Sequence, residues 1–287
     1  MLNPYPCRAD MLIRPEKMMP STPGLADAVW RELYPVAEAA AESEPKLMGI
    51  LDDVVLSRNG LCNAVAVRLA RKLSRRDMGR DELEPLIRTI LKANPQVVDC
   101  IAADLRAVVE RDAACHNALE PLLFFKGFHA LSTYRVAHLL WQEGRHLLAL
   151  LFQSISSEVF GVDIHPAAQI GCGILLDHGT GFVVGETAII ENDVSLLHEV
   201  TLGGTGKEKG GARHPIVRSG VLIGAGAKVL GRVEIGECAK VAASSVVLND
   251  VRPHTTVAGV PAQEVASAAP GEISPALCMQ QSIEAES

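Results

Sequence analysis

A six-residue periodicity in the second half of the chain limits the fold more than any other feature of the sequence. Counting every sixth residue gives two series of apolar positions, separated by an interruption. The first series is Ile164, Ile170, Leu176, Phe182, Ala188, Val194 and Val200, and the second is Val217, Ile223, Val229, Ile235, Val241 and Val247. Gly or another small residue often follows, as in Ile170-Gly171 and Ile235-Gly236. This pattern predicts a solenoid in which each hexapeptide supplies one short strand and one turn.

Three hexapeptides would close a triangular coil of about eighteen residues, with the repeated apolar side chain pointing into a narrow prism. An interior this thin favours Val, Ile, Leu and Ala over large aromatic side chains. The composition agrees, because Phe182 is the one aromatic residue between residues 161 and 262, while that window holds 17 of the 24 glycines. An ordinary β-sandwich would alternate with period two and space its turns irregularly, so it is the weaker interpretation.

The interruption between Val200 and Val217 overshoots the repeat by about eleven residues. Such a segment does not fit within a coil, so residues 203–215 are expected to project from the solenoid as a loop. The loop contains Arg213 and His214 beside two lysines. Exposed loops on rigid scaffolds often carry function, although a tolerated surface insertion is the alternative.

The first half of the chain has the pattern of helices. Asn94 and Pro95 form a cap and first-turn pair, and apolar residues follow them at helical spacing. Pro121 is expected to open a further helix that Gly144 closes. The expected organisation is therefore a disordered lead (1–24), a helical domain (25–160), the solenoid with its projecting loop (161–262) and a flexible acidic tail (263–287).

Composition excludes several classes of protein. The net charge of −7 and a pI near 5.7 argue against a protein that wraps nucleic acid or coats anionic lipid. No apolar run approaches the ~18 residues needed to span a membrane, and the first residues lack the apolar core of a secretory signal. A cytoplasmic location is the resulting expectation. The seven cysteines are scattered without metal or disulfide spacing, so we expect buried or idle thiols.

Three polar pairs stand out against this aliphatic background. They are Asp163 with His165, Asp177 with His178, and Arg213 with His214. At eighteen residues per coil, Asp163 and His178 would lie in adjacent coils near one corner. A carboxylate fixes the tautomer of an imidazole and leaves its other nitrogen free as a base. Such a pair suits an enzyme that deprotonates a substrate hydroxyl, whereas solvated turn residues are the plain alternative, above all for His165 and His198.

The segment that contains these pairs resembles a known family. The run VDIHPAAQIGCGILLDHGTGFVVGETAIIENDVSLLHEVTLGGTGKEKGGARHPIV is similar to serine O-acetyltransferases, and the likeness covers roughly residues 95–262. The resemblance implies an N-terminal helical domain followed by a left-handed parallel β-helix, assembled as trimers that pair into hexamers, with active sites between neighbouring subunits. It also implies acetyl transfer from acetyl-CoA to L-serine, the first step of cysteine synthesis from serine, without a metal or an acyl-enzyme.

The resemblance assigns roles to individual positions. His178 matches the general base, Asp163 the carboxylate that orients it, and His214 a second active-site histidine. Asp112 and Asp177 match the carboxylates that hold the amino acid, and Arg213 matches the residue that meets its carboxylate. The positions that match the coenzyme A groove are Gly204, Ala225, Lys240 and Ala243.

The sequence departs from the family pattern at three places. Ala212 stands where an Asp commonly precedes Arg-His, and Ser244 stands where a Gly is usual. Many members end in an Ile that inserts into the active site of O-acetylserine sulfhydrylase. This chain ends in SIEAES, with Ile283 four residues from the end. The resemblance therefore leaves that partner open.

Other functions stay as alternatives. In a β-helical carbonic anhydrase, histidines from two subunits hold zinc, and two of them are five residues apart. Here His178, His198 and His214 are spaced by 20 and 16 residues. An acetyltransferase for homoserine or a sugar is the second alternative, although two carboxylates and a guanidinium complement an α-amino acid better. A scaffold without catalysis is disfavoured by the retained polar pairs.

Overall fold

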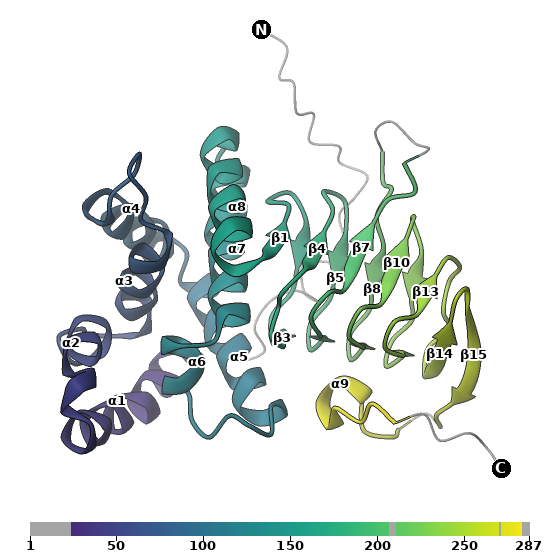
Figure 1. The fold of residues 1–287 in the computed structure, drawn as a ribbon, viewed down its shortest axis with the longest axis horizontal. Helices are drawn as coiled ribbons and strands as arrows, with labels where there is room; N and C mark the ends of the chain where they lie inside the picture. Colours follow the sequence, from purple (N-terminus) through teal and green to yellow (C-terminus); the bar gives the residue numbers. More distant parts are fainter. Residues whose placement is uncertain (1–23, 207–210, 270, 283–287) are drawn as a thin grey trace, which may run out of the picture.

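The hexapeptide repeats form a parallel β-solenoid, and a group of helices precedes it (Figure 1). The computed structural model describes residues 24–206, 211–269 and 271–282, so nearly all of the expected lead lies outside it. The helices are α1 (Leu25–Ser43), α2 (Met48–Leu51), α3 (Leu61–Leu73), α4 (Arg80–Ala93), α5 (Pro95–Arg111), α6 (Leu119–Leu123), α7 (Lys126–Gln142), α8 (His146–Phe160) and α9 (Pro275–Cys278), with a 3-10 turn η3 (Pro45–Leu47) and a π-helical turn η4 (Asp52–Leu56).

The strands are short, and they follow one another around the solenoid. They are β1 (Val162–Ile164), β2 (Gln169–Ile170), β3 (Leu175–Leu176), β4 (Phe182–Val184), β5 (Ile189–Ile190), β6 (Ser195–Leu196), β7 (Thr201–Gly203), β8 (Ile216–Val217), β9 (Leu222–Ile223), β10 (Lys228–Leu230), β11 (Glu234–Ile235), β12 (Lys240–Val241), β13 (Val246–Val247), β14 (Thr255–Gly259) and β15 (Ala262–Ser267).

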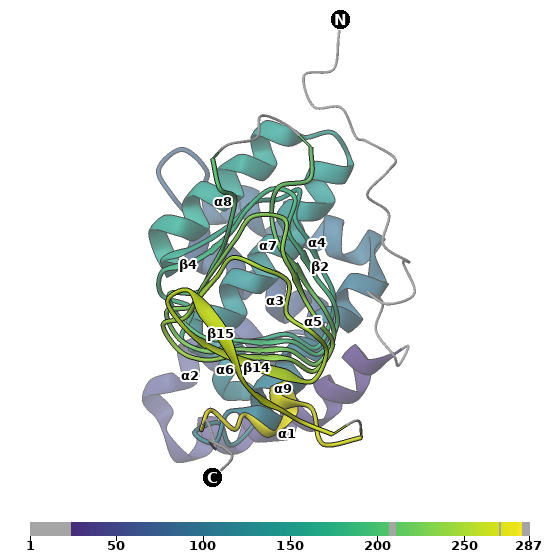
Figure 2. The ribbon, with the colours of Figure 1, turned by 90° about the vertical axis from the view of Figure 1, so that its right-hand side faces the viewer.

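Three sheets enclose the prism, and the view along the solenoid shows its triangular section (Figure 2). The first face is β1-β4-β7-β10-β13, the second is β2-β5-β8-β11, and the third is β3-β6-β9-β12-β14 with β15 at its edge. Pairing is parallel between successive coils, and β15 pairs antiparallel with β14. The fold predicted from the repeats, helices followed by a parallel solenoid, is confirmed.

The coils are not all eighteen residues long. Lys228 pairs with Val246, as eighteen residues per coil requires, but Asp163 pairs with Val183, so the first coil has twenty. Ile189 pairs with Ile216, so the coil that carries the projecting loop has 27 residues, nine more than the basic repeat. The earlier count of about eleven extra residues was wrong by two.

A change of inward position at residues 177–181 explains that difference. Each side of a coil turns two residues inward, two apart, as Val162 and Ile164 do in β1. The six-residue count follows the second inward position up to Leu176, the first from Phe182 to Val200, and the second again from Val217 onward. All thirteen counted residues are nevertheless buried, Phe182 among them with 1% exposed. The count therefore finds the core and misses the extra pair of residues at the turn.

The helical part begins and ends its elements largely as predicted. α5 starts at Pro95, where the missing N–H costs nothing. Asn94 does not cap α5, because its amide donates to the carbonyl of Ile90 at 2.9 Å and closes α4 instead. Gly144 ends α7 with a φ of +77°, as expected for a glycine after a helix.

The single helix expected from Pro121 to Gly144 is wrong. α6 begins at Leu119, before Pro121, and the chain turns at Phe124 before α7 begins. The turn brings Gly127 against β3, where an added Cβ would lie 2.0 Å from the carbonyl oxygen of Leu176. Docking on the solenoid therefore requires the break and the glycine.

Helix α5 ties the helical part to the first coil. Cys100 on α5 forms a disulfide with Cys172 across 72 residues, so the expectation of free thiols is wrong for this pair. Spacing along the chain does not reveal a pair that only tertiary packing brings together. One helical turn later, the Asp104 carboxylate accepts from Arg135 at 2.6 and 2.9 Å and from the N–H of Ile174 at 2.9 Å. These contacts fix α5 and α7 against one corner of the solenoid.

Much of the expected flexible tail is packed on the solenoid instead. β15 pairs with β14, and α9 returns along the third face toward α5 (Figure 1). The carbonyl of Ala276 accepts from Ser195 at 2.8 Å, and Ser274 donates to the carbonyl of Gly220 at 2.7 Å. Ala276 is fully buried. Ile283 lies outside the described residues.

Candidate functional site

The predicted site residues lie at two corners of the solenoid that border the first face. The chain enters this face through residues 177–181, 197–200, 224–227 and 242–245, which we call the His178 corner. It leaves the face through residues 165–168, 185–188, 204–206, 211–215 and 231–233, which we call the His214 corner. One chain therefore holds two separate groups of polar side chains.

Asp112 reaches the His178 corner from the end of α5. The preceding residue, Arg111, is buried and donates to the carbonyl of Gly173 at 3.0 Å and to Asp193 Oδ1 at 3.2 Å. These bonds hold the end of α5 against the first two coils. Asp112 consequently lies close enough to Asp177 for its charge to raise the pKa of that carboxyl.

Asp177 and His178 form the turn that follows β3. The φ of His178 is +55°, a conformation that few residues other than glycine adopt and that is frequent at functional sites. Its side chain is 72% exposed, and its Nε2 lies 3.8 Å from Asp177 Oδ1. Burial raises the pKa of Asp177, an effect that His178 opposes and Asp112 reinforces. Two carboxylates in such a place favour binding of a cationic group between them.

The His178 corner continues along the solenoid as a column of mostly small residues. The ring of His198, one coil further, lies 5.7 Å from the ring of His178. Hydrogen bonds between successive coils continue the column through Ala225 and Ala243. Ser244 has a φ of +58°, which accounts for the glycine usual at this position.

Arg213 and His214 stand at the end of the projecting loop, at the other corner. Arg213 Nη2 donates to Glu186 Oε2 at 2.6 Å, and both side chains are partly exposed. His214 is buried, and its Nδ1 faces the N–H and the hydroxyl of Thr187. Burial lowers the pKa of His214, and the charge of Arg213 adds to this effect. His214 is therefore neutral at pH 7.

Gly185 leaves room for the His214 ring, and Gly204 lies in ordinary contact with it. An added Cβ would lie 2.1 Å from the ring at Gly185 and 3.6 Å from its Nε2 at Gly204. Gly204, expected in the coenzyme A groove, thus lies at the His214 corner, whereas Ala225 and Ala243 lie at the His178 corner.

Asp163 lies in β1 on the first face, between the two corners. Its Oδ1 accepts from Gln153 Nε2 at 2.6 Å. Within the described part of the chain it makes no hydrogen bond to His178, because the register of the first coil pairs Asp163 with Val183, in the strand that follows the His178 turn. The expectation that one chain places Asp163 and His178 at one corner in adjacent coils is therefore wrong.

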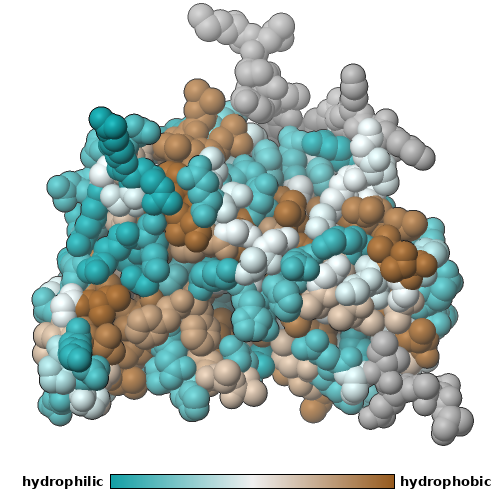
Figure 3. Space-filling view, in the orientation of Figure 1, coloured by the Kyte–Doolittle hydropathy of each residue, from teal (hydrophilic) through white to brown (hydrophobic). Residues whose placement is uncertain are grey.

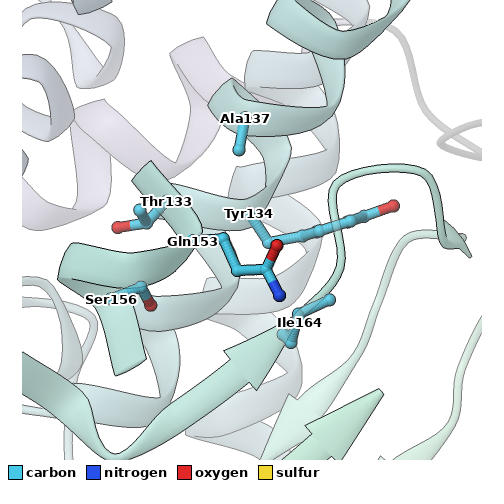
Figure 4. Close-up of a pocket in the computed structure, with 6 residues that line it drawn as sticks. All are labelled: Thr133, Tyr134, Ala137, Gln153, Ser156 and Ile164. Atoms are coloured by element: carbon cyan, nitrogen blue, oxygen red, sulfur yellow. The ribbon is translucent and has the colours of Figure 1, made fainter. Parts of the chain in front are cut away.

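A small pocket lies behind Asp163, between α7, α8 and β1 (Figure 4). It is lined by Thr133, Tyr134, Ala137, Gln153, Ser156 and Ile164. Gln153 extends from this pocket to Asp163, and the Thr133 hydroxyl is already bonded to the carbonyl of His129 at 2.7 Å. The pocket belongs to neither corner.

Lys240, also expected in the coenzyme A groove, contacts the returning tail. It lies in β12 on the third face, and its Nζ donates to the carbonyls of Gln280 at 3.3 Å and Ser282 at 2.7 Å. The Lys240 ammonium, which was expected to meet a coenzyme phosphate, therefore donates hydrogen bonds to the tail instead.

Within residues 24–206, 211–269 and 271–282, no group of three or more His, Cys, Asp or Glu side chains is arranged to hold a metal ion. In the same ranges, no helix combines the length and the apolar character needed to cross a bilayer.

Sequence reasoning missed four residues at these corners. Glu186 and Thr187 contact Arg213 and His214, Gly185 makes space for His214, and Arg111 holds the end of α5. The GETA motif at 185–188 directly follows the strand β4 and therefore lies in a corner of the solenoid. That position was the feature of the sequence that could have identified Gly185, Glu186 and Thr187. The contact with the projecting loop was not visible, because 26 residues separate Thr187 from Arg213.

Comparison with known proteins points to one family. The family model described as "Serine acetyltransferase, N-terminal" matches residues 29–133. The serine acetyltransferase of Haemophilus influenzae is 50% identical over 237 residues, which cover 83% of this chain and 88% of that protein.

Solved structures agree with this result. Serine acetyltransferase from Brucella abortus in complex with coenzyme A has a TM-score of 0.83 and 47% identity, covering 85% of this chain and 97% of that chain. The soybean enzyme complexed with serine has a TM-score of 0.82 and 49% identity, covering 85% and 100%. Similarity on this scale extends over both the helical part and the solenoid.

Proposed function

The chain belongs to the serine acetyltransferase family, and we propose that it transfers the acetyl group of acetyl-CoA to the hydroxyl of L-serine, giving O-acetyl-L-serine and CoA. The observation that carries this proposal is the meeting of Asp112 with Asp177 and His178. These residues come from different parts of the fold, and together they offer two carboxylates for an ammonium next to a candidate base. The soybean relative with bound serine supports this choice of acceptor.

Serine fits the two groups of charges when they face each other. Its ammonium would lie between Asp112 and Asp177, and its carboxylate would meet Arg213, whose guanidinium is 30% exposed. His214 would donate a hydrogen bond from Nε2 to the same carboxylate or to the developing oxyanion. The hydroxyl of serine would then point to His178.

We infer that neighbouring subunits complete this site. The His178 corner and the His214 corner border the same face from opposite sides, so a cyclic arrangement of subunits brings one corner against the other corner of the next chain. Val183 on the first face is 37% exposed, and Leu147 and Leu151 on α8 are 81% and 39% exposed. Figure 3 shows the apolar surface that gathers over α8. A neighbouring chain that covers these side chains would form the expected trimer, which the family resemblance pairs into hexamers.

The same arrangement would bring Asp163 of one subunit to His178 of the next. Asp163 faces outward on the first face, where a neighbouring subunit's corner would pack. It would then orient His178 across the interface and leave the other imidazole nitrogen as the base. A base in this position contributes about 10²- to 10⁴-fold to the rate.

The proposed reaction is a direct attack. His178 takes the proton of the serine hydroxyl while the oxygen bonds to the thioester carbonyl carbon. The tetrahedral oxyanion accepts hydrogen bonds from donors such as His214 or a backbone N–H. When it collapses, the C–S bond breaks and the CoA thiolate takes the proton from His178. Charge and atoms balance without an acyl-enzyme.

Acetyl-CoA would lie along the His178 corner. The small side chains of Ala225 and Ala243 continue this corner beyond His198, so pantetheine would pair with the backbone there. The Brucella abortus relative binds coenzyme A. Lys240 would serve the phosphates only when the tail releases it. The cytoplasmic location, the place in cysteine synthesis and the open question of O-acetylserine sulfhydrylase as a partner stay predictions from the sequence.

The direct test compares acceptors. Release of free thiol from acetyl-CoA is measured with serine, homoserine, threonine and a sugar at matched concentrations. We expect serine to give the highest kcat/KM. A sugar lacks the groups that both carboxylates and Arg213 would bind, homoserine places its hydroxyl one methylene further away, and threonine adds a methyl group beside its hydroxyl. A better rate with another acceptor would refute the serine assignment and leave the acyltransferase class intact.

A further inference from the structure

We propose that Thr187 is a positioning residue that fixes His214 as a hydrogen-bond donor and anchors the end of the projecting loop. This role rests on the proposed function, because it concerns how Arg213 and His214 are presented to serine. Thr187 lies in the corner between β4 and β5 and reaches the loop across 26 residues of chain.

One hydroxyl makes three contacts with the loop end. Thr187 Oγ1 accepts from the backbone N–H of Arg213 at 2.9 Å and from that of His214 at 3.1 Å. It also lies 2.8 Å from His214 Nδ1. Since both acceptor positions are filled by backbone donors, its single proton is left for Nδ1.

The backbone N–H of Thr187 also makes His214 Nδ1 a hydrogen-bond acceptor. This N–H donates to His214 Nδ1 at 3.1 Å. Nδ1 is thus an acceptor toward two donors, and a neutral imidazole then carries its proton on Nε2. The carbonyls of Thr187 and His214 both accept from Arg232 Nη1, at 3.0 and 3.1 Å, which closes the arrangement from the next coil.

The position of the ring leaves Nε2 as the nitrogen that can donate a hydrogen bond to a ligand. An added Cβ at Gly185 would lie 2.1 Å from Nε2, so this edge of the ring has space only because residue 185 is glycine, whereas a Cβ at Gly204 would make an ordinary contact at 3.6 Å. His214 therefore donates a hydrogen bond from a fixed place and accepts no proton during the reaction. This divides the two histidines into a base, His178, and a donor, His214.

Removal of the hydroxyl tests the role. Thr187→Val keeps the shape and leaves two backbone N–H groups of the loop end without their acceptor. We expect the KM for serine to rise about ten- to hundredfold, as the loss of one or two hydrogen bonds predicts. The KM for acetyl-CoA should change less than about twofold. Thr187→Ser, which restores the hydroxyl, should return the serine KM close to the original value.

Thr89→Val is the matched control, because Thr89 is exposed on α4 and belongs to neither corner. It should leave both KM values unchanged. A Thr187→Val enzyme with an unchanged serine KM would overturn the proposal. So would a fall in kcat alone that Thr187→Ser fails to reverse, because that pattern belongs to a purely structural role.

A second measurement does not depend on activity. Solid-state ¹⁵N NMR of the ¹⁵N-histidine-labelled full chain reports which ring nitrogen of His214 holds the proton, with His214→Gln identifying the signals. We expect a neutral ring protonated on Nε2 at pH 7.5. A ring protonated on Nδ1, or on both nitrogens, would overturn the proposal. If serine proves not to be the acceptor, the proposed function fails while this measurement still decides the tautomer.

Discussion

Asp177 carries a charge that its own chain neutralises only in part. Its side chain is 23% exposed, and the imidazole beside it is 3.8 Å away. Burial raises the pKa of the carboxyl, and Asp112 adds to the effect against the opposing influence of His178. A bound ammonium would supply positive charge at this place, so the same surroundings that cost the free protein stability favour the ligand.

Asp177→Asn should therefore lose affinity for serine and gain stability at neutral pH. A carboxyl whose pKa is raised by folding holds its proton more tightly in the folded state. Ionising it above that pKa costs stability, and the cost disappears as the pH falls toward 3.8, the ordinary pKa of an aspartic acid. Asn carries no such cost at any pH.

Melting temperatures measured from pH 7.5 down to pH 4 test this expectation. The variant should melt higher than the parent at pH 7.5, with a gap that closes as the pH falls. The KM for serine should rise while the KM for acetyl-CoA is unchanged. A gap that widens at low pH would contradict the assigned origin of the raised pKa.

At the scale of elements, the joint between α5, α7 and the first coil depends on one buried ion pair. Asp104 and Arg135 are 1% and 5% exposed as side chains. Burial raises the pKa of Asp104, and the charge and two hydrogen bonds of Arg135 oppose that shift. Arg135 also donates to the carbonyl of Gly171 at 2.6 Å, so it bonds the helices to the solenoid directly.

Arg135→Met should destabilise the fold by about 3–5 kcal/mol, because it leaves the Asp104 charge buried without its partner. The shift of the urea unfolding midpoint measures the effect. The double variant Asp104→Leu with Arg135→Met should recover much of the loss, since no charge then remains to be desolvated. A double variant less stable than Arg135→Met would show that the bonds to the solenoid backbone matter more than the charge.

The elements differ in how far the sequence predicts them. Periodicity is sufficient for the solenoid, because most inward positions of the prism hold apolar side chains and every counted residue is buried. It does not distinguish the two inward positions of each side, so the two extra residues near His178 stayed hidden. The break between α6 and α7 was also missed, because it depends on the contact of Gly127 with Leu176, which lie in different parts of the fold.

The candidate site, like the elements, could be predicted from the sequence only in part. The residues were predictable from local motifs and the family resemblance, and the structure does bring Asp112 to Asp177. Their grouping was not predictable, because it depends on coil length and on which corner each turn occupies. Asp163 and His178 illustrate this, since the twenty-residue coil pairs Asp163 with Val183 in β4 and not with the turn that carries His178.

At the scale of the whole molecule, one chain holds two half-sites at opposite edges of its first face. His178 belongs to one half-site and Arg213 to the other, and the first face separates them. If neighbouring subunits complete each site in a cyclic assembly, the two residues used by one serine come from different chains. Subunits damaged in different halves should then repair each other.

Mixed assemblies of His178→Ala and Arg213→Ala subunits test this arrangement. His178→Ala alone should lower turnover at least about a hundredfold through loss of the base, and Arg213→Ala alone should raise the KM for serine through loss of the carboxylate contact. In an assembly refolded from equal amounts of both, chance pairs an intact His178 half with an intact Arg213 half at about one site in four. Activity at low serine should thus recover to about a quarter of the parent value. If each chain instead contained a complete site, no mixture would rise above the mean of the two single variants, because every site would carry one of the two defects.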